Sequence, residues 1–133
     1  MQSAVESIRA IIDALNRGDI DEMLARMAPD FVWTPLEESP VARVYRGREE
    51  VRRYVEDWLG TFEGLHIVLD EPAEVGGHVI AVARGHARGR ASGLQLHNRF
   101  CQVWTIQRGA AVAMEEFPTR EQGLAAVRSR SSD

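Results

Sequence analysis

Several residue types are scarce in this sequence, and the scarcity of cysteine and of long apolar runs excludes some classes of protein. Lysine is absent and cysteine occurs once, at Cys101, so no intramolecular disulfide can form. The histidines and the cysteine lack the spacing of a structural zinc site, and we expect no metal and no cofactor. The apolar runs are too short for a membrane span, and residues 1–12 do not resemble a signal peptide. We therefore expect a cytoplasmic protein in a reducing compartment.

The chain has the length and composition of one globular domain. It contains 133 residues, of which 44% are hydrophobic and 27% are charged. A chain of this length can bury roughly two-thirds of its unfolded surface and needs no disulfide or metal to fold. Twenty acidic against sixteen basic residues give a net charge of -4, which argues against a general nucleic-acid or membrane-surface binder. We predict one domain over residues 1–133, with residues 129–133 as a flexible tail.

Two short helices are predicted at the start of the chain. The first carries an apolar stripe from Ala4 to Leu15 and ends at Gly18, which suits a helix C-terminus. Asp19 can cap the second helix, which we expect to end before Pro29. Short strands are predicted at 31–33 and 44–45.

Two further helices are predicted, one in the middle of the chain and one near its end. The middle helix starts at Arg48, and the pair Thr119 and Gln122 forms a capping box for a last short helix that ends at Val127. The apolar residues of the middle helix recur at i, i+3, i+4, i+7, i+8 and i+11: Val51, Tyr54, Val55, Trp58, Leu59 and Phe62.

Four long antiparallel strands are predicted at 65–75, 78–90, 94–106 and 110–117. If Ser92–Gly93 is a two-residue hairpin loop, Gly85 lies opposite Phe100. A three-residue loop that ends at Gly109 then places Phe100 opposite Glu116. The order of helices and strands predicts an α+β layer fold with the helices on one face of the sheet.

Both predicted hairpins agree on which side chains share a face of the sheet. The opposite face is a solvated or dimer-facing surface in this interpretation, although its cations could also form an anion site or a nucleic-acid patch. A register error of one residue would exchange the faces and bring His97, Arg99, Cys101 and Glu115 into a pocket. The covered face has Ala83, Gly85, Ala87, Leu96, Asn98, Phe100, Gln102, Trp104, Val112, Met114 and Glu116; the opposite face has Arg84, His86, Arg88, His97, Arg99, Cys101, Val103 and Glu115.

The order of elements and four short motifs resemble the SnoaL-like branch of the nuclear transport factor two superfamily. This resemblance implies a cone-shaped, curved antiparallel sheet wrapped by three helices from the N-terminal half, with a short C-terminal helix. It also implies a deep pocket and a homodimer through the sheet. The motifs are Gly18-Asp19-Ile20-Asp21, Pro29-Asp30-Phe31-Val32-Trp33, Tyr45-Arg46-Gly47-Arg48-Glu49-Glu50-Val51 and Val103-Trp104-Thr105-Ile106-Gln107-Arg108-Gly109.

The relatives include ketosteroid isomerases, polyketide cyclases, limonene epoxide hydrolases and scytalone dehydratases. In SnoaL-like cyclases and limonene epoxide hydrolase, an acidic residue on the last strand, just before an aromatic residue, works in the pocket. Glu116 holds that position here. The epoxide hydrolase's Arg-x-Asp pair falls at Ala83 and Gly85, and its Tyr-x-Asn pair at Phe31 and Trp33. We therefore do not expect epoxide hydrolysis by that mechanism.

Glu116 is the candidate general base or acid, because a carboxylate on a covered sheet face needs a partner or a task. Burial would raise its pKa toward neutrality. Asn98 and Gln102 are the candidate groups that orient a ligand carbonyl or stabilise an enolate-like oxygen. The alternatives are a Glu116 carboxylate paired with an arginine or a tyrosine, and amides that satisfy buried backbone groups.

Aromatic residues are the candidate ligand-binding groups. They could enclose a flat or polycyclic ligand next to the small Ala83, Gly85 and Ala87, or they could be ordinary core. Cys101 is interpreted as a small buried hydrophobic residue rather than a nucleophile. The candidate ligand-binding residues are Phe31, Trp33, Tyr54, Trp58, Phe62, Phe100, Trp104 and Met114.

The sequence thus predicts a protein that binds a small, mostly apolar, ring-containing metabolite. As an enzyme it would be a cofactor-independent isomerase, cyclase or lyase, with Glu116 moving the proton and Asn98, Gln102 or Tyr54 polarising the oxygen. The alternative is a non-catalytic ligand-binding or protein-interaction module, which the same fold can host.

Overall fold

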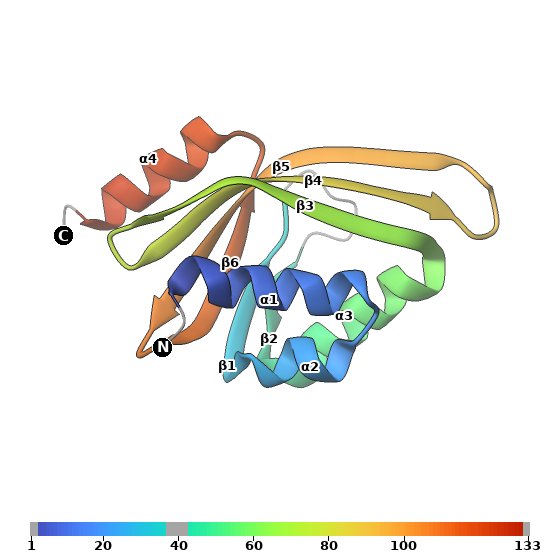
Figure 1. Cartoon of the computed structure of the whole chain (residues 1–133), viewed down its shortest axis with the longest axis horizontal. Helices are drawn as coiled ribbons and strands as arrows, with labels where there is room; N and C mark the ends of the chain where they lie inside the picture. The colour runs from blue at the N-terminus through green and yellow to red at the C-terminus, as the bar shows by residue number, and fades with distance from the viewer. Residues whose placement is uncertain (1–2, 37–42, 132–133) are drawn as a thin grey trace.

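A computed structural model describes residues 3–36 and 43–131 of the chain, and Figure 1 shows how its elements are arranged. Helices α1–α3 lie below one face of a curved, unclosed six-stranded sheet, which confirms the predicted α+β class. The strand order is β2-β1-β6-β5-β4-β3. The elements are α1 (Ala4–Asn16), α2 (Ile20–Ala25), β1 (Met27–Thr34), β2 (Tyr45–Arg46), α3 (Gly47–Thr61), β3 (Phe62–Val75), β4 (His78–Gly89), β5 (Gln95–Gln107), β6 (Ala110–Phe117) and α4 (Arg120–Ser131).

The N-terminal helices begin at their capping residues. Ser3 forms a capping box with Glu6 at the start of α1, and the Asp19 side chain accepts a hydrogen bond from the Glu22 N–H at the start of α2. The prediction that α2 ends just before Pro29 was wrong, because β1 already begins at Met27. Met27 is 2% exposed and lies opposite Ala111 of β6, so core packing and strand pairing fix it in the sheet.

The pairing of β4 with β5 differs from the predicted register by two residues. Gly85 lies opposite Asn98 rather than Phe100. The reason is the loop, which is longer than the two residues that the Ser92–Gly93 sequence suggests. The Gly89 N–H donates to the Leu94 carbonyl at 2.9 Å, so residues 90–93 form the connection.

The pairing of β5 with β6 also differs by two residues in the region of Glu116. Gln102 lies opposite Glu116, in place of the predicted Phe100. The connection is a two-residue turn in which Arg108 (φ 53°) and Gly109 (φ 78°) are both left-handed, and a bulge near Val112 adds one further residue. Because side chains alternate with a period of two, both shifts leave the predicted faces of the strands near Glu116 intact.

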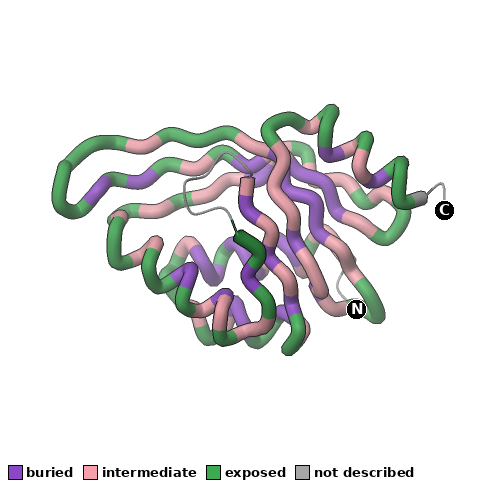
Figure 2. The backbone as a smooth tube through the Cα atoms, turned by 180° about the vertical axis from the view of Figure 1, so that it is seen from behind, coloured by how far each residue is buried: buried purple, intermediate pink, exposed green. Residues whose placement is uncertain are grey.

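One face of the sheet carries the main core. Figure 2 shows buried residues along both the strands and the helices. The bulge places Ala111, which is 2% exposed, in this core instead of the predicted Val112. One strand pair, β1 with β6, is parallel. The largest fully buried side chains on this face include Trp104, Phe31, Ile8, Ile11, Met23, Met27 and Met114.

The opposite face of the sheet is partly covered by a helix, so the prediction that all helices lie on one face was wrong. Helix α4 lies across it and forms a second, smaller core in which Cys101, Val103 and Val127 are almost completely buried. Gly123 lets the helix approach, because a Cβ atom there would lie 2.7 Å from the Cys101 Sγ. The helix also continues beyond the predicted end at Val127, to Ser131. None of the described helices combines the length and apolar character needed to cross a bilayer.

Candidate functional site

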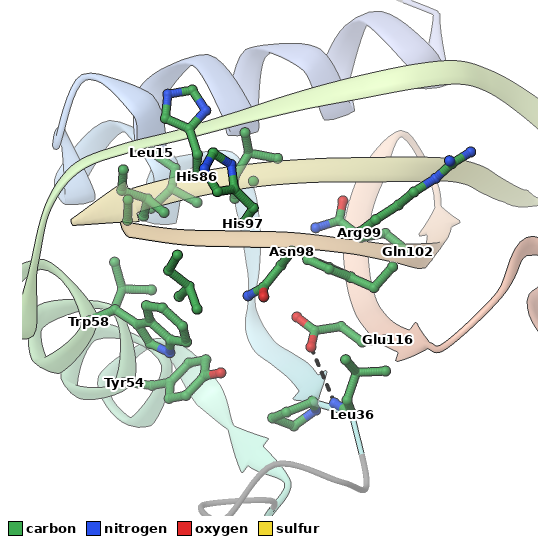
Figure 3. A pocket seen from close by; sticks show the side chains of 18 of the residues that line it. Leu15, Leu36, Tyr54, Trp58, His86, His97, Asn98, Arg99, Gln102 and Glu116 are labelled. Carbon is green, nitrogen blue, oxygen red and sulfur yellow. Dashed lines mark hydrogen bonds between the residues drawn. The ribbon is translucent and has the colours of Figure 1, made fainter. Parts of the chain in front are cut away.

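A cavity of about 500 Å³ lies between the inner face of the sheet and helix α3. Figure 3 shows that side chains from α3, β5 and β6 point into it. The lining is mostly apolar, with a few polar groups. It comprises Leu15, Trp33, Pro35, Leu36, Tyr54, Val55, Trp58, Leu65, Ile67, Gly85, His86, Ala87, Leu96, His97, Asn98, Arg99, Phe100, Gln102 and Glu116.

Glu116 is held in the cavity wall by two neutral donors. Its Oε2 accepts a hydrogen bond from the Trp33 indole N–H at 3.2 Å, and its Oε1 accepts one from the Leu36 backbone N–H at 3.2 Å. Burial raises the pKa of this carboxyl above its ordinary value, and the two hydrogen bonds oppose that rise. Among the described residues, no arginine or histidine forms an ion pair with it. The arrangement therefore favours a carboxyl that can both take up and release a proton.

Tyr54 faces Glu116 from helix α3. Burial raises the pKa of its hydroxyl to about 12, and the charge of Glu116 adds to the rise. The ring packs edge-on against Trp33 at 5.3 Å between centroids and stacks on Tyr45 at 4.3 Å. With this pKa the hydroxyl keeps its proton at neutral pH, so Tyr54 can donate a hydrogen bond to a ligand oxygen.

The two predicted amides have different surroundings. Gln102 is 2% exposed, and its Oε1 accepts a hydrogen bond from the Trp104 indole N–H at 2.9 Å, so this oxygen is used within the core. Asn98 is exposed, and Figure 3 shows its amide directed into the same space as the Glu116 carboxylate. The polar groups that converge on one part of the cavity are therefore Glu116, Asn98 and the Tyr54 hydroxyl.

The eight predicted ligand-binding residues, seven aromatic residues and Met114, fall into three groups. Those that line the cavity are Trp33, Tyr54, Trp58 and Phe100. Phe62 stacks on Trp58 at 4.7 Å between centroids without being part of the lining. The other three, Phe31, Trp104 and Met114, are at most 1% exposed and belong to the core beneath the cavity.

Several lining residues were not identified from the sequence. Leu15 and Val55 lie on helical stripes that could have indicated them, since each stripe had to face the sheet. Leu36 had no such signal, because its backbone N–H reaches a carboxylate eighty positions away. Ile67 is held in place by Asn16, whose amide donates to the Ile67 carbonyl at 2.9 Å and whose oxygen accepts from the Ile67 N–H at 2.8 Å.

The basic residues that border the cavity belong mainly to the other face of the sheet. His86, His97 and Arg99 contribute to the lining, but their side chains turn away from Glu116 and Asn98 (Figure 3). Within residues 3–36 and 43–131, no group of three or more His, Cys, Asp or Glu side chains is gathered to hold a metal ion.

Cys101 lies under helix α4 and not in the cavity. It is 0% exposed, and burial raises the pKa of its thiol while the nearby Arg120 charge opposes the rise. A thiol with these properties is a packing group, because only the thiolate is an effective nucleophile.

The comparisons with known proteins agree with the fold. A family model described as a SnoaL-like domain matches residues 8–114. Among solved structures, the chain is similar to an NTF2-like protein from Burkholderia thailandensis, with a TM-score of 0.78 and 29% identity over 96% of this chain and 98% of the other. No curated protein matches the chain.

Two more distant structures have the same fold and carry small molecules. One is TerC co-crystallized with polyporic acid, with a TM-score of 0.76 and 20% identity over 94% of this chain and 98% of the other. The other is a protein with a ketosteroid isomerase-like fold from Catenulispora acidiphila in complex with trimethylamine, with a TM-score of 0.76 and 13% identity over 90% of each chain. At these identities the likeness concerns the fold alone.

Proposed function

Because the chain belongs to the SnoaL-like domain family, we propose that its cavity binds a small, mostly apolar, ring-containing metabolite and that Glu116 carries out cofactor-free acid/base chemistry on it. The family's fold commonly binds small molecules. The observation that carries the proposal is a partly buried carboxyl, bonded only to neutral donors, that faces a tyrosine hydroxyl and an amide across an apolar cavity.

The cavity suits a ring-containing ligand in size and in lining. Its volume of about 500 Å³ is within the range of small-molecule sites in proteins, roughly 300–1,000 Å³. Trp33, Trp58 and Phe100 offer aromatic surface, and Gly85 and Ala87 leave room along β4 because their side chains are small. A flat apolar ring could pack against the indoles while a single oxygen reaches the polar groups.

The chemistry follows from the protonation states of the polar groups. An ionised Glu116 can accept a proton from a carbon next to a carbonyl, and the raised pKa makes this carboxylate a stronger base than an exposed one. Tyr54 and Asn98 can donate hydrogen bonds to the oxygen that gains negative charge. The same carboxyl can then return the proton elsewhere, as an isomerase, cyclase or dehydratase requires.

A ligand-binding module without turnover is the second candidate function. One observation favours it: both oxygens of Glu116 already accept hydrogen bonds from the protein, and these bonds tie Trp33 and Leu36 to strand β6. In this case the carboxylate would shape the cavity without moving a proton.

Two further properties remain proposals. A homodimer through the outer face of the sheet would use the part of that face that α4 does not cover, and sedimentation equilibrium would reveal it. A cytoplasmic location stays a prediction.

The two candidate functions are separated by a ligand panel and two matched variants. We would measure thermal stability of the wild type, Glu116→Gln and Glu115→Gln with a panel of polycyclic ketones and lactones. Glu115 is the next residue on β6 and points to the opposite face, where it pairs with Arg130. If the protein is an enzyme, a ligand should stabilise all three proteins, and only the wild type and Glu115→Gln should convert it. A ligand that stabilises the proteins but is converted by none of them favours the binding module. If no ligand in the panel stabilises any of the proteins, both candidate functions are contradicted.

A further inference from the structure

Gly85 lies in the wall of the cavity that contains Glu116, on the inner face of the sheet. It occupies the interior of β4, directly opposite Ile67 on β3 and Asn98 on β5. Both strand pairings run through this position without a shift in register, which excludes a β-bulge there. Glycine inside a strand weakens it, because glycine loses much conformational freedom on folding and has no side chain to pack. A glycine at this position therefore needs an explanation.

Neither the backbone conformation nor the packing requires a glycine here. Seven of the eleven glycines have a positive φ, and a Cβ atom at Gly89 or Gly123 would lie 2.6 or 2.7 Å from a side-chain atom. Gly85 has neither property. A Cβ atom there would lie 3.7 Å from the Ile67 Cγ1 and 3.9 Å from the His66 carbonyl oxygen, which are ordinary van der Waals distances. The fold would tolerate a side chain at residue 85, so the space that glycine leaves free is available to a ligand.

Gly85 and Glu116 lie far apart within the same cavity. Glu116 is opposite Gln102 on β5, whereas Gly85 is opposite Asn98, four residues earlier on β5 and on the other side of that strand. With strands about 4.8 Å apart and about 3.3 Å per residue along a strand, the two backbone positions are on the order of 15 Å apart along the sheet. A ligand with a single ring at Glu116 does not reach Gly85, whereas a ligand with a second ring in line does.

The two ends of the cavity also differ in polarity. The carboxylate of Glu116 and the hydroxyl of Tyr54 lie at one end. Around Gly85 the inner face is apolar, and it carries Ile67 on β3 and Leu96 on β5. Ile67 and Leu96 are only partly buried, so an apolar group placed between them would remove their remaining surface from water.

We propose that Gly85 determines the ligand specificity of this cavity, by leaving room for a second, apolar ring of an elongated ketone. The ring with the ketone lies at Glu116, and the second ring lies over the backbone of Gly85, against Ile67 and Leu96. The difference in polarity between the two ends fixes the direction of the ligand. This inference rests on the proposed function, because it takes the same cavity as the ligand site.

The test compares two ketones that differ in the second ring, cyclohexanone and 4-phenylcyclohexanone. We would measure Kd for each by isothermal titration calorimetry with the full chain as wild type, Gly85→Ala and Gly85→Val. The matched control is Gly60→Ala in α3, at an exposed position outside the cavity lining. A side chain at residue 85 takes the place of the second ring, so Kd for 4-phenylcyclohexanone should rise roughly 10- to 200-fold in Gly85→Val and less in Gly85→Ala. Kd for cyclohexanone should not change in either variant, and Gly60→Ala should bind both ketones as the wild type does.

Urea unfolding shows whether the glycine serves the strand instead of a ligand. Because a Cβ atom at residue 85 meets only ordinary contacts, Gly85→Ala should unfold at the same urea concentration as the wild type or at a higher one. A lower unfolding midpoint would mean that β4 itself needs this glycine, and it would overturn the proposal.

The outcomes separate this inference from the proposed function. A wild-type preference for 4-phenylcyclohexanone that Gly85→Val removes supports the inference. Unchanged binding of 4-phenylcyclohexanone by Gly85→Val, or equal weakening for both ketones, would overturn it and leave the proposed function intact. If the wild type binds neither ketone, the proposed function is contradicted and this inference with it. Glu116→Gln should keep the preference for 4-phenylcyclohexanone, because contact with the second ring does not depend on proton transfer.

Discussion

Helix α4 packs on the outer face of the sheet through one glycine, and this contact makes a quantitative prediction. In Gly123→Ala the new Cβ would lie 2.7 Å from the Cys101 Sγ and 3.1 Å from a Val103 methyl group. Such overpacking in a tight core costs about 1–3 kcal/mol. The higher helix propensity of alanine returns up to about 1 kcal/mol. We therefore expect Gly123→Ala to change the free energy of unfolding by between about 0 and -3 kcal/mol.

The matched control is Gly60→Ala in α3. Gly60 is exposed, and a Cβ there meets no atom within 4 Å. The same substitution should therefore stabilise the protein by up to about 1 kcal/mol. Urea unfolding followed by far-UV circular dichroism gives both values. The difference between the two variants should be about 1–3 kcal/mol, which is the overpacking cost alone.

A double-mutant cycle identifies the contact itself. In a Cys101→Ala background the Sγ is absent, so Gly123→Ala should cost less than it does in the wild type. If Gly123→Ala and Gly60→Ala are equally stabilising, α4 does not lie against Cys101, and the account of the outer face is wrong.

Three further predictions concern the cavity and its supports. Asn16→Ala removes both hydrogen bonds to the Ile67 backbone and should destabilise the protein by about 2–3 kcal/mol in urea unfolding; a cost below about 0.5 kcal/mol would contradict the tie between α1 and β3. Burial raises the pKa of Glu116 in the folded state above its pKa in the unfolded state. Between these two pKa values the folded state therefore binds more protons than the unfolded state. The contribution of Glu116 to stability falls as the pH rises through this window and is constant above it. Glu116→Gln should lack this fall, and stability curves of the two proteins that stay parallel from pH 4 to pH 8 would refute the shift. Trp33→Phe removes one donor to the ionised carboxylate and should raise the pKa of Glu116 further, as carbon-13 NMR titration of glutamate carboxyls can measure; an unchanged or lower pKa would contradict the hydrogen bond.

Much of this fold was predictable from the spacing of apolar residues along the helices, the alternation of side chains along the strands and the helix-capping residues. The stripe from Val51 to Leu59 predicts helix α3 because the i, i+3, i+4 spacing can bury one face in no other regular structure. The side of the sheet that carries Glu116 was also predictable, because an error of two residues in the register does not change the face.

The sequence left open those features that depend on distant contacts. The register errors came from the loop at residues 90–93 and from the bulge near Val112, and both depend on backbone conformations that neighbouring sheet pairing selects. The position of α4 depends on the fit of Gly123 against Cys101, which no periodic pattern reveals. The alternative interpretation paired Glu116 with an arginine or a tyrosine, whereas the structure has an indole and a backbone N–H. Only the folded chain places Leu36 beside Glu116.

Proton abstraction by Glu116 is the central claim, and hydrogen exchange tests it without knowledge of the natural substrate. The measurement is the rate at which the wild type, Glu116→Gln and Glu115→Gln exchange the acidic C–H protons of 2-tetralone for deuterium in D2O, followed by proton NMR. The account predicts exchange faster than in buffer with the wild type and Glu115→Gln, and exchange at the buffer rate with Glu116→Gln. Exchange that is equally fast with Glu116→Gln, or no faster than buffer with the wild type, would contradict a general base at this position.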